Sequence, residues 1–169
     1  MLRPVLARFT LTATFLTAVA CTASTSVVTT AIPPKLKGDW RGTLVTANAP
    51  DSADDFEWRS PTRFRLVISD SSRRVYVWNE ETWREIKPGT FGITVFDTSA
   101  VVTSITRGID EDGVWVETWS FALTVIDSNH VRAMFQRQVN NKDMKRNDPG
   151  ATWGHVAFGV LERGSDADV

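Results

Sequence analysis

The sequence of 169 residues contains a single cysteine, Cys21, so no disulfide can form within the chain. The folded part must therefore be stabilised by packing alone. Histidine is almost as rare, because only His130 and His155 occur, and neither has a second ligand at a metal-binding spacing. We therefore expect no metal site in this protein.

An excess of charge is also missing. The chain has 19 basic and 20 acidic residues, which gives a formal net charge of −1. This balance lacks the basic surplus of nucleic-acid-binding proteins, so no nucleic-acid partner is expected. Four carboxylates gather between Asp51 and Glu57, but this segment lacks the central glycine of an EF-hand loop and is interpreted as a solvated acidic loop.

Catalytic signatures are absent as well. Ser120 lies in Trp119-Ser120-Phe121 and not between two glycines, and no HExxH motif, phosphate-binding glycine loop or dinucleotide fingerprint occurs. Asp97 and Glu117 are a carboxylate pair of the kind that glycoside hydrolysis needs, but only their separation would decide that mechanism. The sequence favours a non-catalytic protein without a cofactor.

The amino terminus has the organisation of a secretory leader. Arg3 and Arg8 accompany an apolar run, Phe9–Ala20, and small residues at positions 18 and 20 precede Cys21. The run has 12 residues, whereas a membrane-spanning helix needs about 20. We therefore expect cleavage after Ala20.

The segment that ends at Cys21 resembles a bacterial lipobox, in which small residues precede a cysteine that becomes acylated. This resemblance implies that Cys21 carries a diacylglyceryl group and an amide-linked acyl chain such as palmitate, which together give a stable membrane anchor. Thr22 stands where aspartate would retain a lipoprotein in the inner membrane, so the resemblance implies the periplasmic face of the outer membrane. The alternative is ordinary secretion into the periplasm with a free thiol.

Composition divides the rest of the chain into a tether and a domain. Residues 21–35 comprise the lipidated cysteine and a segment rich in threonine and serine that ends in Pro33-Pro34. The folded domain is predicted to cover residues 36–165, after the signal peptide (1–20) and this tether.

From Asp39 onward, apolar residues recur with a period of two, which is typical of β-strands. Only Asn79–Ile86 is predicted to turn helically. Most connections are short and therefore favour antiparallel neighbours. The sequence predicts an all-β fold in which an antiparallel up-and-down meander of about eight strands closes into a small barrel, with a β-sandwich as the alternative. The expected strands are 39–47, 62–69, 73–79, 90–96, 99–107, 114–126, 130–139 and 152–162.

Two hairpins allow the strand register to be predicted. A three-residue loop at 127–129 gathers the large apolar side chains on one face by pairing Val125 with Val131, Leu123 with Ala133, Phe121 with Phe135 and Trp119 with Arg137. The same reasoning at 70–72 pairs Phe64 with Trp78 and Leu66 with Tyr76, which would form a second aromatic cluster.

The segment Gly38-Asp39-Trp40 resembles the start of the first strand in lipocalins and avidins, the calycin barrels. This resemblance implies an up-and-down barrel, and a barrel of eight strands has an interior just wide enough for its own side chains or for one small ligand. It also implies that an arginine from a late strand, Arg137 or Arg163, packs on Trp40 and closes one end.

One charged pair interrupts the apolar faces of neighbouring strands. In the predicted register Glu117 lies diagonal to Arg137 beside Trp119, and buried charges are costly unless they are paired. The 15-residue connection Ala47–Pro61, which contains Trp58, is a candidate lid. The predicted ligand-binding residues are Trp40, Trp58, Trp78, Glu117, Trp119 and Arg137.

These observations lead to two functional hypotheses. In the first, an envelope lipoprotein binds one small apolar or aromatic molecule in its barrel, as strand number and the seven tryptophans suggest. In the alternative, the barrel is filled with side chains and the protein is a non-catalytic interaction or assembly module with a protein partner in the envelope.

Overall fold

The computed structural model describes residues 31–48, 62–111, 113–145, 147–148 and 150–164, and these residues form nine strands and no helix. Cys21 and Trp58 lie outside the described residues. The strands are β1 (Gly38–Asn48), β2 (Thr62–Ile68), β3 (Arg73–Trp78), β4 (Trp83–Ile86), β5 (Gly92–Phe96), β6 (Ser99–Asp110), β7 (Gly113–Val125), β8 (His130–Asn141) and β9 (Thr152–Arg163).

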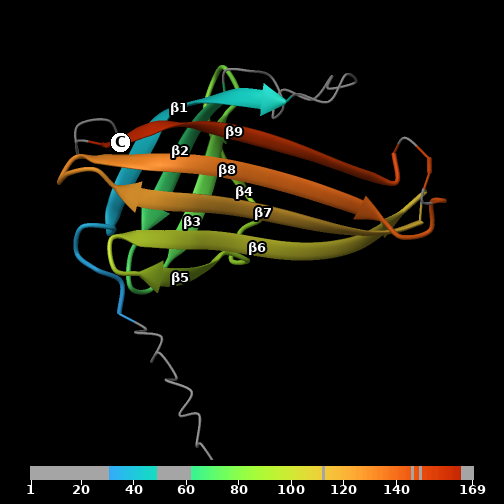
Figure 1. The fold of residues 1–169 in the computed structure, drawn as a ribbon, viewed down its shortest axis with the longest axis horizontal. Helices are drawn as coiled ribbons and strands as arrows, with labels where there is room; N and C mark the ends of the chain where they lie inside the picture. The colour runs from blue at the N-terminus through green and yellow to red at the C-terminus, as the bar shows by residue number, and fades with distance from the viewer. Residues whose placement is uncertain (1–30, 49–61, 112, 146, 149, 165–169) are drawn as a thin grey trace, which may run out of the picture.

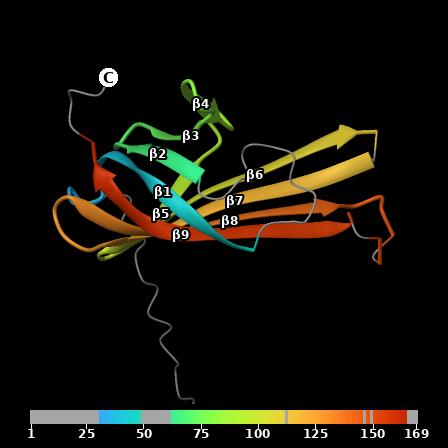
Figure 2. The ribbon, with the colours of Figure 1, turned by 90° about the horizontal axis from the view of Figure 1, so that it is seen from above.

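The nine strands form one antiparallel sheet in the order β4-β3-β2-β1-β9-β8-β7-β6-β5. Consecutive strands are neighbours except for β4 and β5, which form the two edges of the sheet, and β9 returns to pair with β1. This is the order of an up-and-down barrel whose ladder is interrupted between β4 and β5 in the described part of the chain. The sheet curls into a half-barrel (Figures 1 and 2). The predicted all-β meander is therefore confirmed, with nine strands instead of about eight.

The additional strand is β4, where a helical turn was predicted, so that prediction is wrong. The side-chain oxygen of Asn79 accepts hydrogen bonds from the backbone N–H groups of Glu81 and Thr82, which fixes a tight turn after β3. This turn returns the chain antiparallel to β3, so that Trp83 pairs with Trp78. Trp83 thus lies in a strand and not in a connection.

The predicted register of β7 and β8 is confirmed in full, from Val125 opposite Val131 to Trp119 opposite Arg137. The register of β2 and β3 differs from the prediction by one residue, because Phe64 pairs with Val77 and not with Trp78. A four-residue turn, Ser69–Ser72, replaces the predicted three-residue loop, with the N–H of Ser69 donating to the carbonyl of Ser72. The second aromatic cluster inside the barrel is therefore absent, and Trp78 lies on the outer face.

The interior of the half-barrel is filled with side chains. Phe135 lies at its centre and contacts the rings of Phe64, Phe121 and Trp119 at centroid distances of 4.8–5.2 Å. All four side chains are buried. Such interdigitated aromatic packing excludes water from this part of the molecule.

One end of the half-barrel is closed by the segment that precedes β1. Ile32 and Leu36 are buried, so packing begins slightly before the predicted start at residue 36. The indole N–H of Trp40 donates to the carbonyl of Leu36 over 2.9 Å, and the Arg163 guanidinium lies 4.2 Å from the centroid of the indole ring. The late-strand arginine that packs on Trp40 is therefore Arg163 and not Arg137.

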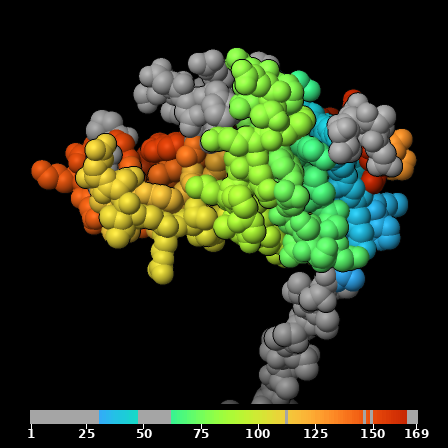
Figure 3. Space-filling view, turned by 180° about the vertical axis from the view of Figure 1, so that it is seen from behind, coloured from blue at the N-terminus to red at the C-terminus, as the bar shows by residue number. Residues whose placement is uncertain are grey.

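The other end of the sheet is open. Strands β6–β9 are longer than β2–β5 and extend beyond them, so that part of their concave face is not covered by the opposite strands (Figure 2). Seen from behind, the end of β6 projects past the segments that follow β3 (Figure 3). The candidate site lies on this extension.

Candidate functional site

A pocket of about 340 Å³ lies on the concave face of the extension. We call it the mouth pocket. Its walls come from β6–β9 and from the connection after β4, and its lining residues are Lys87, Asp110, Trp115, Glu117, Arg137, Val139, Asn141 and Trp153.

Glu117 is the central charged group of the mouth pocket, and its side chain is only 4% exposed. The alternation of β7 turns its odd-numbered residues inward, so that Glu117 shares a face with Trp115 and Trp119. One carboxylate oxygen accepts a hydrogen bond from Nε of Arg137, and the other forms an ion pair with Nζ of Lys87. The predicted Glu117–Arg137 pair is confirmed, with Lys87 as a second cation.

The two cations keep Glu117 ionised. Burial by itself raises the pKa of this carboxyl group, but the hydrogen bond from Lys87 and the charges of Arg137 and Lys87 outweigh that effect. The pKa of Glu117 therefore lies below its ordinary value of 4.5. At neutral pH the floor of the pocket carries one negative and two positive charges.

Both cations also lie against indole rings. The Arg137 guanidinium lies between Trp119 and Trp153, at 5.1 and 4.9 Å from the ring centroids. Nζ of Lys87 lies 5.5 Å from the centroid of Trp115. These cation–π contacts fix the orientation of the charged side chains and of the pocket walls together.

A glycine makes room for one of these walls. Gly108 pairs with Trp115 across β6 and β7, and a Cβ atom at Gly108 would lie 2.3 Å from a ring carbon of Trp115. Only a residue without a side chain lets this indole lie against β6.

The predicted ligand-binding residues do not form a single site. Glu117 and Arg137 line the mouth pocket, and Trp119 lies directly beneath it. Trp40 is buried at the closed end of the half-barrel. Trp78 packs against Trp83 on the outer face, with the Arg63 guanidinium 5.0 Å from its ring centroid.

Sequence reasoning did not identify Lys87, Trp115 or Trp153 as pocket residues. The two tryptophans follow the inward alternation of β7 and β9, so the strand pattern contained a signal for them. Lys87 had none, because it lies in the Lys87–Thr90 turn, where its carbonyl accepts a hydrogen bond from the N–H of Thr90. Only the folded chain brings this turn to β7.

His155 lies on the same face of the sheet, deeper than the pocket. It is buried, its Nε2 atom lies 2.9 Å from the Thr46 hydroxyl, and its ring contacts Phe135 edge-on. Burial lowers the pKa of His155 below its ordinary value of 6.5, and the positive charge of Arg137 lowers it further. His155 is therefore neutral in the folded protein at neutral pH.

This lowered pKa makes stability depend on pH. Below pH 6.5 the unfolded chain takes up a proton at position 155 more readily than the folded chain, so the free energy of unfolding falls as the pH decreases. We expect His155→Gln to show a smaller loss of stability than the wild type between pH 7.5 and 5.5. Urea unfolding at the two pH values measures this difference, and equal losses in both proteins would contradict the prediction.

The described residues contain no group of three or more acidic, histidine or cysteine side chains placed to hold a metal ion. They also do not place Asp97 near Glu117. Asp97 lies just before Ser99, the first residue of β6, whereas Glu117 pairs with Thr106 of the same strand. Ser99 and Thr106 are seven residues apart, which corresponds to roughly 23 Å along the strand at 3.3 Å per residue. The carboxyl groups of glycosidases lie about 5–9.5 Å apart, so these two residues are not such a pair.

Comparisons with protein-family models, with curated proteins and with solved structures give no match to this chain. Among the residues that the structure describes, no helix has the length and apolar character needed to cross a membrane.

Proposed function

We propose that this protein is an envelope lipoprotein that binds one small aromatic or apolar molecule in the mouth pocket. The observation that carries this proposal is the combination of indole walls, Trp115 and Trp153, with a buried carboxylate that two cations hold in place. Ligand sites typically combine apolar and aromatic walls with a few fixed polar groups.

The size of the pocket limits the ligand. A volume of about 340 Å³ is near the lower end of the range for small-molecule sites, roughly 300–1,000 Å³. Because Phe64, Phe121 and Phe135 fill the interior below, a ligand cannot extend deeper into the half-barrel. These limits favour a molecule of one or two fused rings over a long acyl chain.

Intrinsic tryptophan fluorescence tests ligand binding. We expect indole, naphthol or naphthoquinone to quench or shift the emission in a saturable manner, and Trp153→Leu to weaken the binding at least tenfold. Trp78→Leu, on the outer face, is the matched control and should leave the affinity unchanged. If none of the three probes nor an envelope lipid extract changes the emission, and native mass spectrometry shows no bound molecule, the proposal fails.

The envelope location is a separate part of the proposal and rests on the leader and the lipobox resemblance at Cys21. We expect Cys21→Ala to release the protein from membranes without changing its unfolding midpoint, because the residue precedes the folded domain. Cell fractionation measures the release. A correctly processed Cys21→Ala protein that still sediments with membranes, and is solubilised only by detergent, would refute the lipid anchor.

The filled interior favours a second candidate function. A half-barrel packed with aromatic side chains fits an interaction module as well as a carrier, and several large apolar side chains on its outer face are exposed, including Phe158 and Val160. In this case a protein partner would co-purify while the mouth pocket stays empty. Pull-down from detergent-solubilised envelopes distinguishes the two candidates.

A further inference from the structure

One stretch of the sheet has a strand neighbour on one side only. The short strand β5 pairs with Ser99–Thr103 of β6, and its last partner is Gly92 opposite Thr103. The remaining part of β6, Ser104–Asp110, pairs only with β7 among the described strands. We call this part the β6 edge, and it forms the border of the extension (Figure 1).

The β6 edge can accept another strand. In an antiparallel ladder the N–H and C=O groups of alternate residues point to opposite sides, so about half of those in this segment point away from β7. An exposed row of such groups is a template for an added strand.

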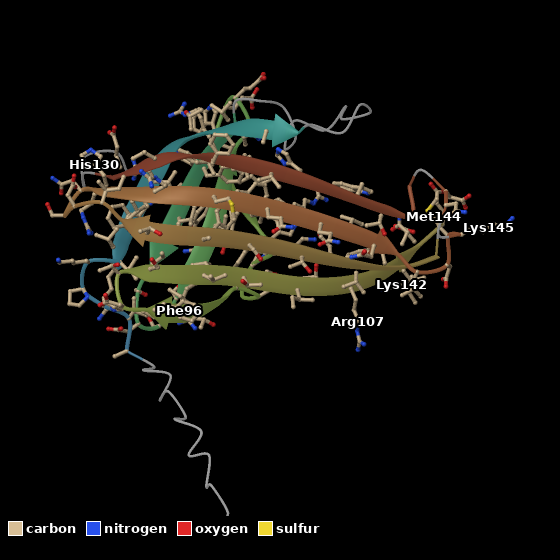
Figure 4. All side chains as sticks on the ribbon, viewed as in Figure 1. Phe96, Arg107, His130, Lys142, Met144 and Lys145 are labelled. Atoms are coloured by element: carbon tan, nitrogen blue, oxygen red, sulfur yellow. The ribbon has the colours of Figure 1, made fainter. Side chains whose placement is uncertain are left out.

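The outward side chains of the β6 edge have an apolar-charged-apolar pattern. Ile105 is 68% exposed and Ile109 is 80% exposed, and Arg107 lies between them on the same face. The Arg107 side chain makes no ion pair with the part of the chain that the structure describes, and it projects away from the sheet (Figure 4). The edge thus presents two apolar contacts and one cation that has no anionic partner among the described residues.

This pattern disfavours a second copy of the chain as the added strand. An antiparallel register that matches Ile105 with Ile109 of another copy places the two Arg107 side chains directly opposite each other. Like charges in directly opposite positions destabilise a strand pair. If the register is shifted by two residues, Arg107 instead lies opposite an isoleucine of the other copy. Arg107 therefore disfavours pairing of this edge with a second copy.

We propose that the β6 edge binds an extended segment of a partner protein by strand addition. The segment has an acidic residue opposite Arg107 and an apolar residue two positions away on each side, opposite Ile105 and Ile109. Main-chain hydrogen bonds supply the affinity, and the charge supplies the specificity. This proposal gives the second candidate function a defined surface, and it does not depend on a ligand in the mouth pocket.

A symmetric synthetic peptide tests the proposal, because it can pair in either direction. We expect a fluorescently labelled peptide with the sequence Thr-Val-Thr-Glu-Thr-Val-Thr to bind the wild type at least tenfold more tightly than the peptide with lysine at its centre. Arg107→Glu should reverse this preference. Fluorescence anisotropy measures both affinities.

Three further variants locate the binding. Ile105→Lys with Ile109→Lys should abolish peptide binding, whereas Phe96→Lys, an exposed aromatic residue on β5, should leave it unchanged. Trp153→Leu should also leave it unchanged, which separates this site from the mouth pocket. Equal binding of both peptides by the wild type, or loss of binding in Trp153→Leu, would overturn the proposal.

Self-association tests the role of Arg107 without a peptide. The wild type and Arg107→Lys should sediment as monomers, whereas Arg107→Thr should form a dimer, because the isoleucines can then pair across two copies. Sedimentation velocity measures the change. A monomeric Arg107→Thr protein would contradict the protective role of this side chain.

Discussion

Arg137→Met should lower the free energy of unfolding by about 3 kcal/mol, near the lower end of the range for breaking a buried ion pair. The methionine keeps much of the apolar stem between Trp119 and Trp153, so the loss reflects mainly the charge. Glu117 stays buried but keeps Lys87 as a partner, which limits the cost. Urea titration at pH 7 measures the change.

A double variant and a surface pair are the controls. Glu117→Gln combined with Arg137→Met should be more stable than the sum of the two single changes predicts, because both changes remove the same ion pair and its contribution is lost only once. Arg74 and Glu85 form a cross-strand pair on the outer surface, and Arg74→Met should have a much smaller effect than Arg137→Met. Equal effects of the two arginine substitutions would show that the Glu117 pair is solvated.

The largest single effect should come from Phe135→Ala, which we expect to cost about 3–5 kcal/mol. Phe135 contacts four rings, those of Phe64, Trp119, Phe121 and His155, so its removal leaves a cavity that none of them can fill. The same titration measures the loss of stability.

Phe158→Ala is the matched control, because Phe158 lies on the outer face of the neighbouring strand and is 53% exposed. Its substitution should cost much less than that of Phe135. If the two phenylalanines contribute equally, the inward face assigned to β8 is wrong, and with it the filled interior.

The β7–β8 hairpin was predictable from sequence because its two faces differ in polarity. Phe121 and Leu123 alternate with Ser120, Ala122 and Thr124, and Gln136 follows Phe135, so a shift by one residue would place polar groups in the core. The pairing of Glu117 with Arg137 followed from this register alone. The local pattern of β7 and β8 thus predicted the Glu117–Arg137 pair but not the third charged group, Lys87.

The β2–β3 hairpin and β4 were not predictable in the same way. In β3 both faces are apolar, since Val75 and Val77 point inward while Tyr76 and Trp78 point outward. Periodicity cannot choose between two apolar faces, and the four-residue turn decides the register. β4 has four residues, two of them charged, and becomes a strand only because β3 offers it a partner.

The mouth pocket depends on contacts between distant parts of the chain. Lys87 reaches Glu117 from a turn 30 residues away, and Gly108 admits the Trp115 ring across the β6–β7 ladder. Neither contact has a periodic signature. Strand alternation therefore predicts which side chains of β7, β8 and β9 face the pocket. The contacts of Lys87 and Gly108 depend on the curvature of the folded sheet.

The indole N–H signals of the tryptophans report directly on whether a small aromatic molecule binds in the mouth pocket. In a ¹H–¹⁵N NMR titration with naphthol, assigned through single tryptophan variants, we expect saturable shifts for Trp115 and Trp153, while Trp40 and Trp78 stay unchanged. Shifts centred on Trp78 and Trp83, or none at saturating naphthol, indole and naphthoquinone, would show that the mouth pocket does not bind a small aromatic molecule.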